Sequence, residues 1–149
     1  MAGDTRTGVT IHRTTPELDA GPIAAQAAFD LHQDDDAGTV FARSAELAVR
    51  LLDDVLPDPQ FTPQPDGGVT YAEKVTPADR DLDLDRPAQE NVNRVRALSP
   101  HIGARAVVDD RPLIVWKTGI AADGSLEFLE VQPEGGNRMP YDAYLRGRR

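Results

Sequence analysis

Residues 8–13, with the sequence GVTIHR, alternate apolar and polar side chains and decide the fold of the first half of the chain. This alternation is typical of a half-buried strand, with Val9 and Ile11 on one face and His12 on the other. The apolar run at 23–29 predicts a second strand, although its alanines also suit a helix. The chain therefore starts with two strand-forming stretches on either side of a polar, turn-rich loop.

A long amphipathic helix is predicted at residues 40–56, where apolar side chains recur at helical spacing. Asp36 is the expected N-cap, and prolines end the helix. Residues 57–69 are rich in Pro and Gly and predict a linker between two domains. Strands and helix together predict a βαβ-like fragment, in which residues 8–13 would lie in a parallel sheet and leave an aggregation-prone edge.

The second half of the chain predicts a small β-rich domain. Apolar side chains on one face of 88–98, between Pro87 and Pro100, predict a short helix. The other elements expected here are extended backbone at 70–75, strands at 104–108, 113–118 and 126–131, and a helical turn within 140–149.

Composition narrows the possible functions. The chain has 149 residues, is 40% apolar and has no cysteine, which excludes disulfides, thiolate metal sites and cysteine nucleophiles. The net charge is −9, with −8 in residues 1–70 and −1 in residues 71–149, so any RNA contact is expected in the second half. No apolar run approaches the roughly 18 residues of a membrane span. We expect no signal peptide, no membrane and a cytoplasmic location.

Several segments, in one consistent order, resemble the formyltransferase family and its methionyl-tRNA formyltransferase branch. That family moves a formyl group from 10-formyltetrahydrofolate to an amine. The matching segments are GVTIHR at 8–13 with ELDAGPI at 17–23, TYAEKV at 70–75, NRVRA at 93–97 with Pro100, VWK at 115–117, and VQPEGGNRM at 131–139. The branch assignment rests mostly on the QPEG stretch within the last segment.

The resemblance implies an α+β chain made of two parts. Residues 1–56 would be the end of a Rossmann-like α/β catalytic domain, 57–69 the linker, and 70–149 an OB-like tRNA-binding β-barrel domain. The barrel is expected to be abbreviated, because residue 117 is followed almost at once by the strand at 126–131.

The resemblance also implies a missing part of the active site. The family's catalytic domain begins with a half that carries an Asn and a His, and nothing similar precedes Gly8. Met1 is therefore expected to be an internal methionine of a longer protein, and the chain alone is expected to be inactive.

Formyl transfer needs an oxyanion stabiliser and a group that takes a proton from the attacking amine. The resemblance assigns the first role to the missing Asn and His and the second, through ordered water, to Asp19. His12 would support Asp19, and the folate pocket would be lined by Thr15, Pro16, Glu17 and Leu18. From the residues alone, a turn aspartate is the favoured interpretation of Asp19 and an ordinary strand residue that of His12, and only the resemblance favours a catalytic Asp19. No metal is expected.

Basic residues of the second half are the candidates for contacts with initiator methionyl-tRNA. The strongest candidates are Lys74, Arg94, Arg96, Lys117 and Arg138, within a wider set that adds Arg105, Arg111, Arg146, Arg148 and Arg149. Ordinary solvated arginines are the alternative for each of them. Trp116 is expected in the core and not as a base-stacking platform.

Two other functions stay open at this stage. The domain after residue 70 could work alone as an RNA-binding OB-like module without catalysis, or the chain could belong to a formyltransferase for a sugar amine. The expected partners of the leading interpretation are initiator methionyl-tRNA and the folate donor, and the full-length enzyme is expected to be monomeric.

Overall fold

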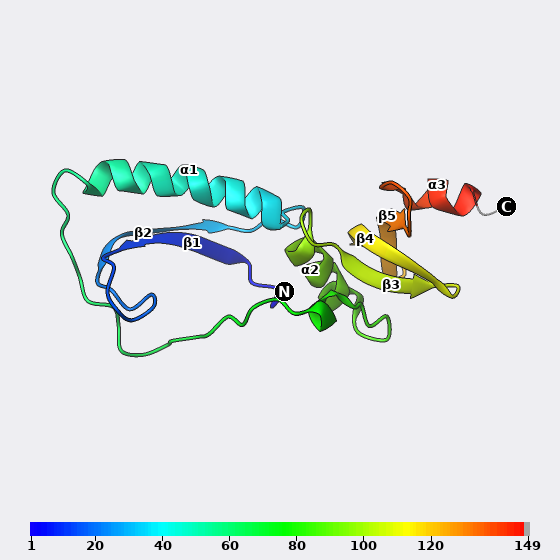
Figure 1. Cartoon of the computed structure of the whole chain (residues 1–149), viewed down its shortest axis with the longest axis horizontal. Coiled ribbons are helices and arrows are strands. Elements are labelled where there is room, and N and C mark those ends of the chain that lie inside the picture. The colour runs from blue at the N-terminus through cyan, green and yellow to red at the C-terminus, as the bar shows by residue number, and fades with distance from the viewer. Residues whose placement is uncertain (148–149) are drawn as a thin grey trace. The chain divides into compact units, whose positions relative to one another are not determined.

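The computed structural model describes residues 1–147, which form two units with separate sheets (Figure 1). The hairpin–helix unit comprises Asp4–Gln33 and Thr39–Glu73, and the sheet unit comprises Met1–Gly3, Asp34–Gly38 and the chain from Lys74 onward. Both units mix helices and strands, which confirms the predicted α+β class. The boundary predicted at residues 57–69 stays a prediction.

Strands β1 (Arg6–His12) and β2 (Ile23–Asp30) form the first sheet as an antiparallel pair. The register runs from Arg6 opposite Asp30 to His12 opposite Ile23, with an irregularity between Ile11 and His12. The prediction that residues 8–13 lie in a parallel sheet was therefore wrong for the described chain. A parallel connection needs a crossover of about a dozen residues or more, and the loop at 13–22 is shorter.

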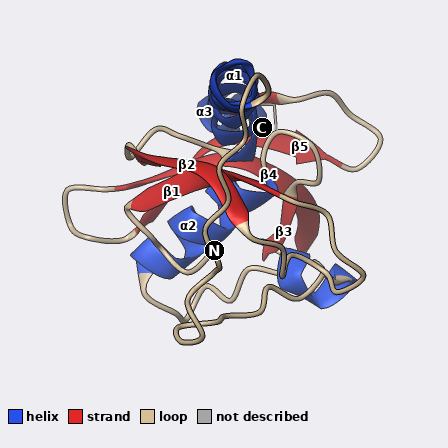
Figure 2. Ribbon diagram, turned by 90° about the vertical axis from the view of Figure 1, so that its left-hand side faces the viewer, coloured by secondary structure: helices blue, strands red, loops and turns tan. Residues whose placement is uncertain are grey.

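Helix α1 (Ala37–Val55) lies over this two-stranded ribbon (Figures 1 and 2). Arg43 joins the helix to β2, because its guanidinium lies 4.4 Å from the centre of the Phe29 ring and donates to the Asp30 carbonyl oxygen at 2.8 Å. No α1 residue is fully buried, and Phe41 is 69% exposed. The unit thus has a helical cover without a closed core.

The sheet unit is built on a four-stranded antiparallel meander in the order β3-β4-β5-β6. The strands are β3 (Ala104–Val108), β4 (Arg111–Ile120), β5 (Leu126–Pro133) and β6 (Met139–Pro140). Within the described residues β3 and β6 are not paired, so this sheet is open and not a closed barrel. Asp109 and Asp110, with φ values of 49° and 61°, make the tight turn between β3 and β4.

Helices flank this sheet and supply its core. Helix α2 (Ala88–Leu98) has the predicted bounds, and a 3-10 helix (Pro77–Arg80) precedes it, while α3 (Tyr141–Arg146) is the predicted turn near the end. Leu98 of α2 is 1% exposed and clusters with Val115 of β4, and Tyr144 of α3 packs on Leu113 and Val131. None of the helices within residues 1–147 is long and apolar enough to cross a membrane.

Candidate functional site

The proposed catalytic pair, His12 and Asp19, comes together at the loop that joins β1 to β2. His12 ends β1, and Asp19 lies in the loop at 13–22. The distance from His12 Nε2 to Asp19 Oδ1 is 3.8 Å. The Asp19 side chain is 82% exposed and that of His12 29%. The carboxylate is therefore open to an incoming molecule, while the imidazole behind it is largely covered.

A backbone contact fixes the orientation of the His12 ring. Its Nδ1 lies 3.1 Å from the carbonyl oxygen of Arg13, which can only accept, so Nδ1 carries a proton. Nε2 is then a lone-pair acceptor in the neutral ring and a donor in the imidazolium. An ion pair with Asp19 forms only in the second case.

Asp19 itself has an unusual backbone conformation, with φ of 55°. Aspartate is among the few residues with a side chain that adopt this left-handed region readily. The conformation turns the chain sharply just before Gly21, which is buried. A turn role for Asp19 is thus real, and it is compatible with a carboxylate directed toward solvent.

A short brace formed by residues 61–64 holds the base of this loop. Thr62 exchanges two backbone hydrogen bonds with Ile23, at 2.8 and 2.9 Å, and Phe61 lies under the Arg13 guanidinium at 3.9 Å. The Gln64 side-chain amide donates to the carbonyl oxygens of Asp19 at 2.6 Å and Gly21 at 2.7 Å. Sequence reasoning assigned this segment to a linker and missed Gln64. The signal available was a glutamine between Pro63 and Pro65, which stiffen the backbone on both sides.

The loop and the brace line an open pocket of ≈ 1140 Å³ within the hairpin–helix unit. Of the predicted folate-pocket residues, Glu17 and Leu18 line it and Thr15 and Pro16 do not. The Thr15 hydroxyl instead donates to the Glu17 carbonyl oxygen at 3.0 Å and shapes the turn. Leu18 is 91% exposed, so an apolar side chain is presented beside the Asp19 carboxylate. This combination suits a ligand with a flat apolar part and a polar reacting group.

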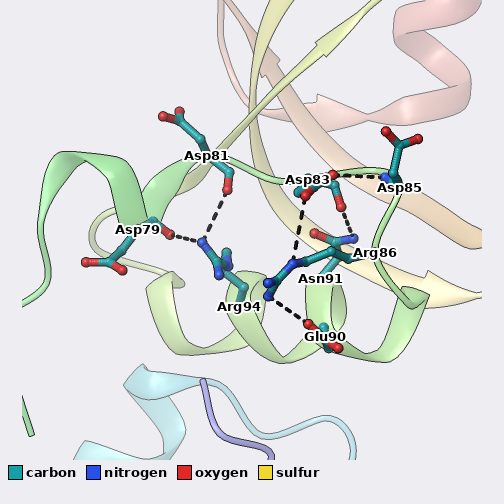
Figure 3. Close-up of polar contacts among 8 residues, drawn as sticks. All are labelled: Asp79, Asp81, Asp83, Asp85, Arg86, Glu90, Asn91 and Arg94. Carbon is teal, nitrogen blue, oxygen red and sulfur yellow. Dashed lines mark hydrogen bonds and ion pairs between the residues drawn. The ribbon is translucent and has the colours of Figure 1, made fainter.

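Two of the predicted tRNA-binding arginines, Arg94 and Arg96, donate hydrogen bonds to backbone carbonyls inside the sheet unit. Arg94 donates to the carbonyl oxygens of Asp79 and Asp81, at 3.2 and 3.3 Å, as Figure 3 shows. Arg96 donates to the Asp35 carbonyl oxygen at 2.6 Å. Arg94 meets the backbone of Asp79 and Asp81, and the carboxylates of both residues point away from its guanidinium (Figure 3).

Arg138 and Trp116 form one stack. The guanidinium lies 3.3 Å from the centre of the Trp116 ring and donates to the Pro100 carbonyl oxygen at 2.7 Å. The indole N–H donates to Gln132 at 3.1 Å. Trp116 is half-buried, and Arg138 covers one face of its ring, which leaves that face closed to a stacking base.

The remaining basic candidates differ in their surroundings. Lys74, Lys117 and Arg111 are exposed, whereas Arg105 pairs with Asp81 at 2.8 Å. Two further candidates, Arg148 and Arg149, lie outside the described residues. The structure therefore presents Lys74 and Lys117 to solvent and binds Arg94, Arg96 and Arg138 into the fold.

Comparison with known proteins gives consistent family matches. The family described as formyl transferase matches residues 1–56. A methionyl-tRNA formyltransferase from Halorhodospira halophila is 35% identical and aligns with 100% of this chain and 57% of its own length. One from Dechloromonas aromatica is 32% identical over 99% of this chain and 55% of its own. The chain thus spans a little over half the length of these relatives.

Solved structures show the same fold at lower identity. A methionyl-tRNA formyltransferase from Clostridium thermocellum matches 88% of this chain and 57% of its own, with a TM-score of 0.74 and 17% identity. HypX from Aquifex aeolicus in complex with tetrahydrofolic acid matches 96% of this chain and 30% of its own length, with a TM-score of 0.67 and 16% identity. An N-formyltransferase from Helicobacter canadensis, in complex with folinic acid and dTDP-3-aminofucose, matches 79% of this chain and 45% of its own length, with a TM-score of 0.66 and 15% identity. The chain is thus similar along its whole length to part of curated methionyl-tRNA formyltransferases, its first 56 residues match the formyl transferase family, and its fold is similar to that of a solved methionyl-tRNA formyltransferase.

Proposed function

We propose that this chain supplies part of an active site that transfers a formyl group from 10-formyltetrahydrofolate to the amino group of initiator methionyl-tRNA. The observation that carries the proposal is the exposed Asp19 carboxylate beside His12, at the rim of a pocket, in a chain whose relatives along its whole length are methionyl-tRNA formyltransferases. The setting proposed is translation initiation in the cytoplasm, by a monomer.

Asp19 has the role of proton acceptor in this proposal. The α-amine has a reference pKa of about 8, so much of it is protonated near neutrality and must lose a proton before it attacks the formyl carbon. The 82% exposed carboxylate accepts that proton, directly or through water. His12 donates from Nδ1 to the Arg13 carbonyl oxygen and points Nε2 at Asp19, so in its imidazolium form it stabilises the Asp19 carboxylate.

The formyl donor would lie in the pocket beside Asp19. Leu18 provides apolar surface for its flat ring system, Glu17 a polar edge, and Thr15 fixes the turn that positions both. Pro16 limits the flexibility of that turn. The oxyanion that develops on the formyl group would be stabilised by residues from the length of the relatives that this chain does not match.

For the tRNA we propose contacts by the exposed Lys74 and Lys117, with Arg94, Arg96 and Arg138 shaping the surface and contributing charge. Phosphate contacts would make binding strongly salt-dependent. Binding of the 149-residue chain to initiator tRNA, measured across a salt series, should weaken as salt rises and weaken further after Lys74→Ala and Lys117→Ala. Tight, salt-dependent binding together with no transfer by a completed enzyme would favour the stand-alone RNA-binding function.

The decisive experiment is a formylation assay on a fusion protein that adds the unmatched length of the Halorhodospira halophila relative. With 10-formyltetrahydrofolate and initiator methionyl-tRNA, we expect turnover by the fusion and none by the 149-residue chain. Asp19→Asn should lower kcat by about 10² to 10⁴-fold, the usual range for loss of a general base. Asp58→Asn, an exposed carboxylate of the same unit that does not line the pocket, is the matched control. Undiminished transfer by Asp19→Asn would refute the proposal. Faster transfer to a nucleotide-linked amino sugar than to initiator methionyl-tRNA would show that the acceptor substrate is the sugar and not the tRNA.

A further inference from the structure

We infer that Gln64 is a positioning residue for Asp19, and that the Pro-rich segment around it is a working part of the site. The inference rests on the proposed function of Asp19. The two residues are 45 positions apart in the sequence, so their contact is produced by the fold and not by the loop itself. Gln64 lines the pocket, and its side-chain amide acts on Asp19 through the backbone of the loop.

The Gln64 amide uses both of its N–H groups on the loop. One hydrogen bond goes to the Asp19 carbonyl oxygen at 2.6 Å and one to the Gly21 carbonyl oxygen at 2.7 Å. The opposite assignment of the amide would place Oε1 against two carbonyl oxygens, which repel it, so the amide nitrogen must face the loop. The two carbonyls flank Ala20, and a single planar group therefore fixes the direction of the chain on both sides of it.

The donor group is itself held in place. Thr62 pairs with Ile23 through two backbone hydrogen bonds at 2.8 and 2.9 Å, two residues before Gln64. Pro63 and Pro65 restrict the backbone on either side of Gln64. Gln64 is half-buried, whereas the loop that it holds is exposed at Asp19. The pairing of Thr62 with Ile23 at the start of β2 thus fixes the brace, and the brace fixes the loop through Gln64.

The position of Asp19 needs such support. Its φ of 55° lies in a region that residues with a side chain adopt less often than ordinary backbone angles, although aspartate tolerates it better than most, and its carboxylate, 82% exposed, has little packing to orient it. Without the two hydrogen bonds the loop can relax toward ordinary backbone angles and carry the carboxylate away from His12. A displacement of about 1 Å of a reacting group can lower a rate by ~10²-fold while leaving binding intact.

The test compares Gln64→Ala and the isosteric Gln64→Glu, which removes the donors, with Gln60→Ala in the fusion protein described above. Gln60 is the matched control, because it belongs to the same segment and its amide donates only to Asp58 among the contacts described. For both Gln64 variants we expect kcat to fall about 10 to 100-fold with KM for tRNA and formyl donor within about twofold. For Gln60→Ala we expect parent values, and all variants should keep the parent thermal midpoint within a few degrees.

A second measurement needs no turnover and uses the 149-residue chain. Asp19→Asn should change the His12 ring resonances in the parent and change them much less in the Gln64→Ala background, while Gln60→Ala should leave the change intact. An equal change in all backgrounds would overturn the inference. So would a parent-like kcat for Gln64→Ala in a fusion that Asp19→Asn inactivates. If instead Asp19→Asn leaves transfer undiminished while the His12 response still depends on Gln64, the proposed function fails and the positioning role stands.

Discussion

Replacing Gly21 by alanine should open the loop that carries Asp19. A Cβ at this position would lie 1.7 Å from the Arg13 carbonyl oxygen and 3.1 Å from His12 Nδ1. The first distance is about half of an ordinary carbon–oxygen contact, so backbone must move by more than 1 Å, beyond what rotation of a side chain can relieve. That backbone is tied by the hydrogen bond from the Arg13 N–H to the Pro22 carbonyl oxygen at 3.0 Å.

Overpacking of this kind costs about 1–3 kcal/mol, and a clash with backbone belongs at the upper end. About 3 kcal/mol corresponds to a fall of roughly 100-fold in the closed population of the loop, since ~1.4 kcal/mol is a factor of ten. Amide hydrogen exchange should show this as a loss of protection at Arg13 and Ile23, whose N–H groups donate to Pro22 and Thr62.

The control for this experiment is Gly67→Ala in the same unit. A Cβ at Gly67 meets nothing within 4 Å, so the substitution should leave exchange at the loop unchanged. Equal protection in the two variants would refute the steric reasoning, because it would mean that the backbone around Arg13 can move aside at no cost.

Three further predictions concern the sheet unit. The Thr76 backbone N–H and hydroxyl, both 2.7 Å from the Asp79 carboxylate, hold the pKa of that carboxyl below the ordinary 3.8. The stability that this lowered pKa gives is present above pH 3.8 and is lost as the pH falls through the lower value of the folded state. NMR titration of the parent should show the lowered pKa, and Asp79→Asn should lose this pH dependence of stability. Leu98→Ala should lower the free energy of unfolding by about 2–5 kcal/mol in urea, because Leu98 is 1% exposed in the core. Arg138→Lys keeps the charge but loses the planar stack, so the fluorescence of the single tryptophan, Trp116, should shift to longer wavelength with a stability loss of about 0.5–1 kcal/mol.

Local sequence patterns predicted the elements of this fold well where the elements themselves are local. Helix α2 begins and ends at the predicted residues, because its apolar face repeats at helical spacing between Pro87 and Pro100. Strands β3 to β5 follow from their alternation and from turn residues such as Asp109. The pairing of β1 with β2 did not follow, because alternation indicates a strand but carries no information about the direction of its partner.

The candidate site shows the same division. The resemblance to a family pointed to His12 and Asp19, which lie 3.8 Å apart in the structure, and spacing alone could not have distinguished Asp19 from a turn residue. Gln64 could not be predicted, because its role depends on the Thr62–Ile23 pairing, a contact between distant segments. The prolines of residues 57–69 indicate a restricted backbone, but a restricted backbone is found both in linkers and in segments packed against another part of the fold, such as this brace.

The brace matters because the unit that contains it lacks a closed core. Each fully buried apolar side chain among the described residues belongs to the sheet unit, whereas Phe41 and Leu56 of the hairpin–helix unit are both 69% exposed. A two-stranded ribbon under one helix has little hydrophobic free energy with which to fix a loop. The position of Asp19 in this unit must therefore come from directional polar contacts, and the two donated by Gln64 hold its backbone at Asp19 and Gly21.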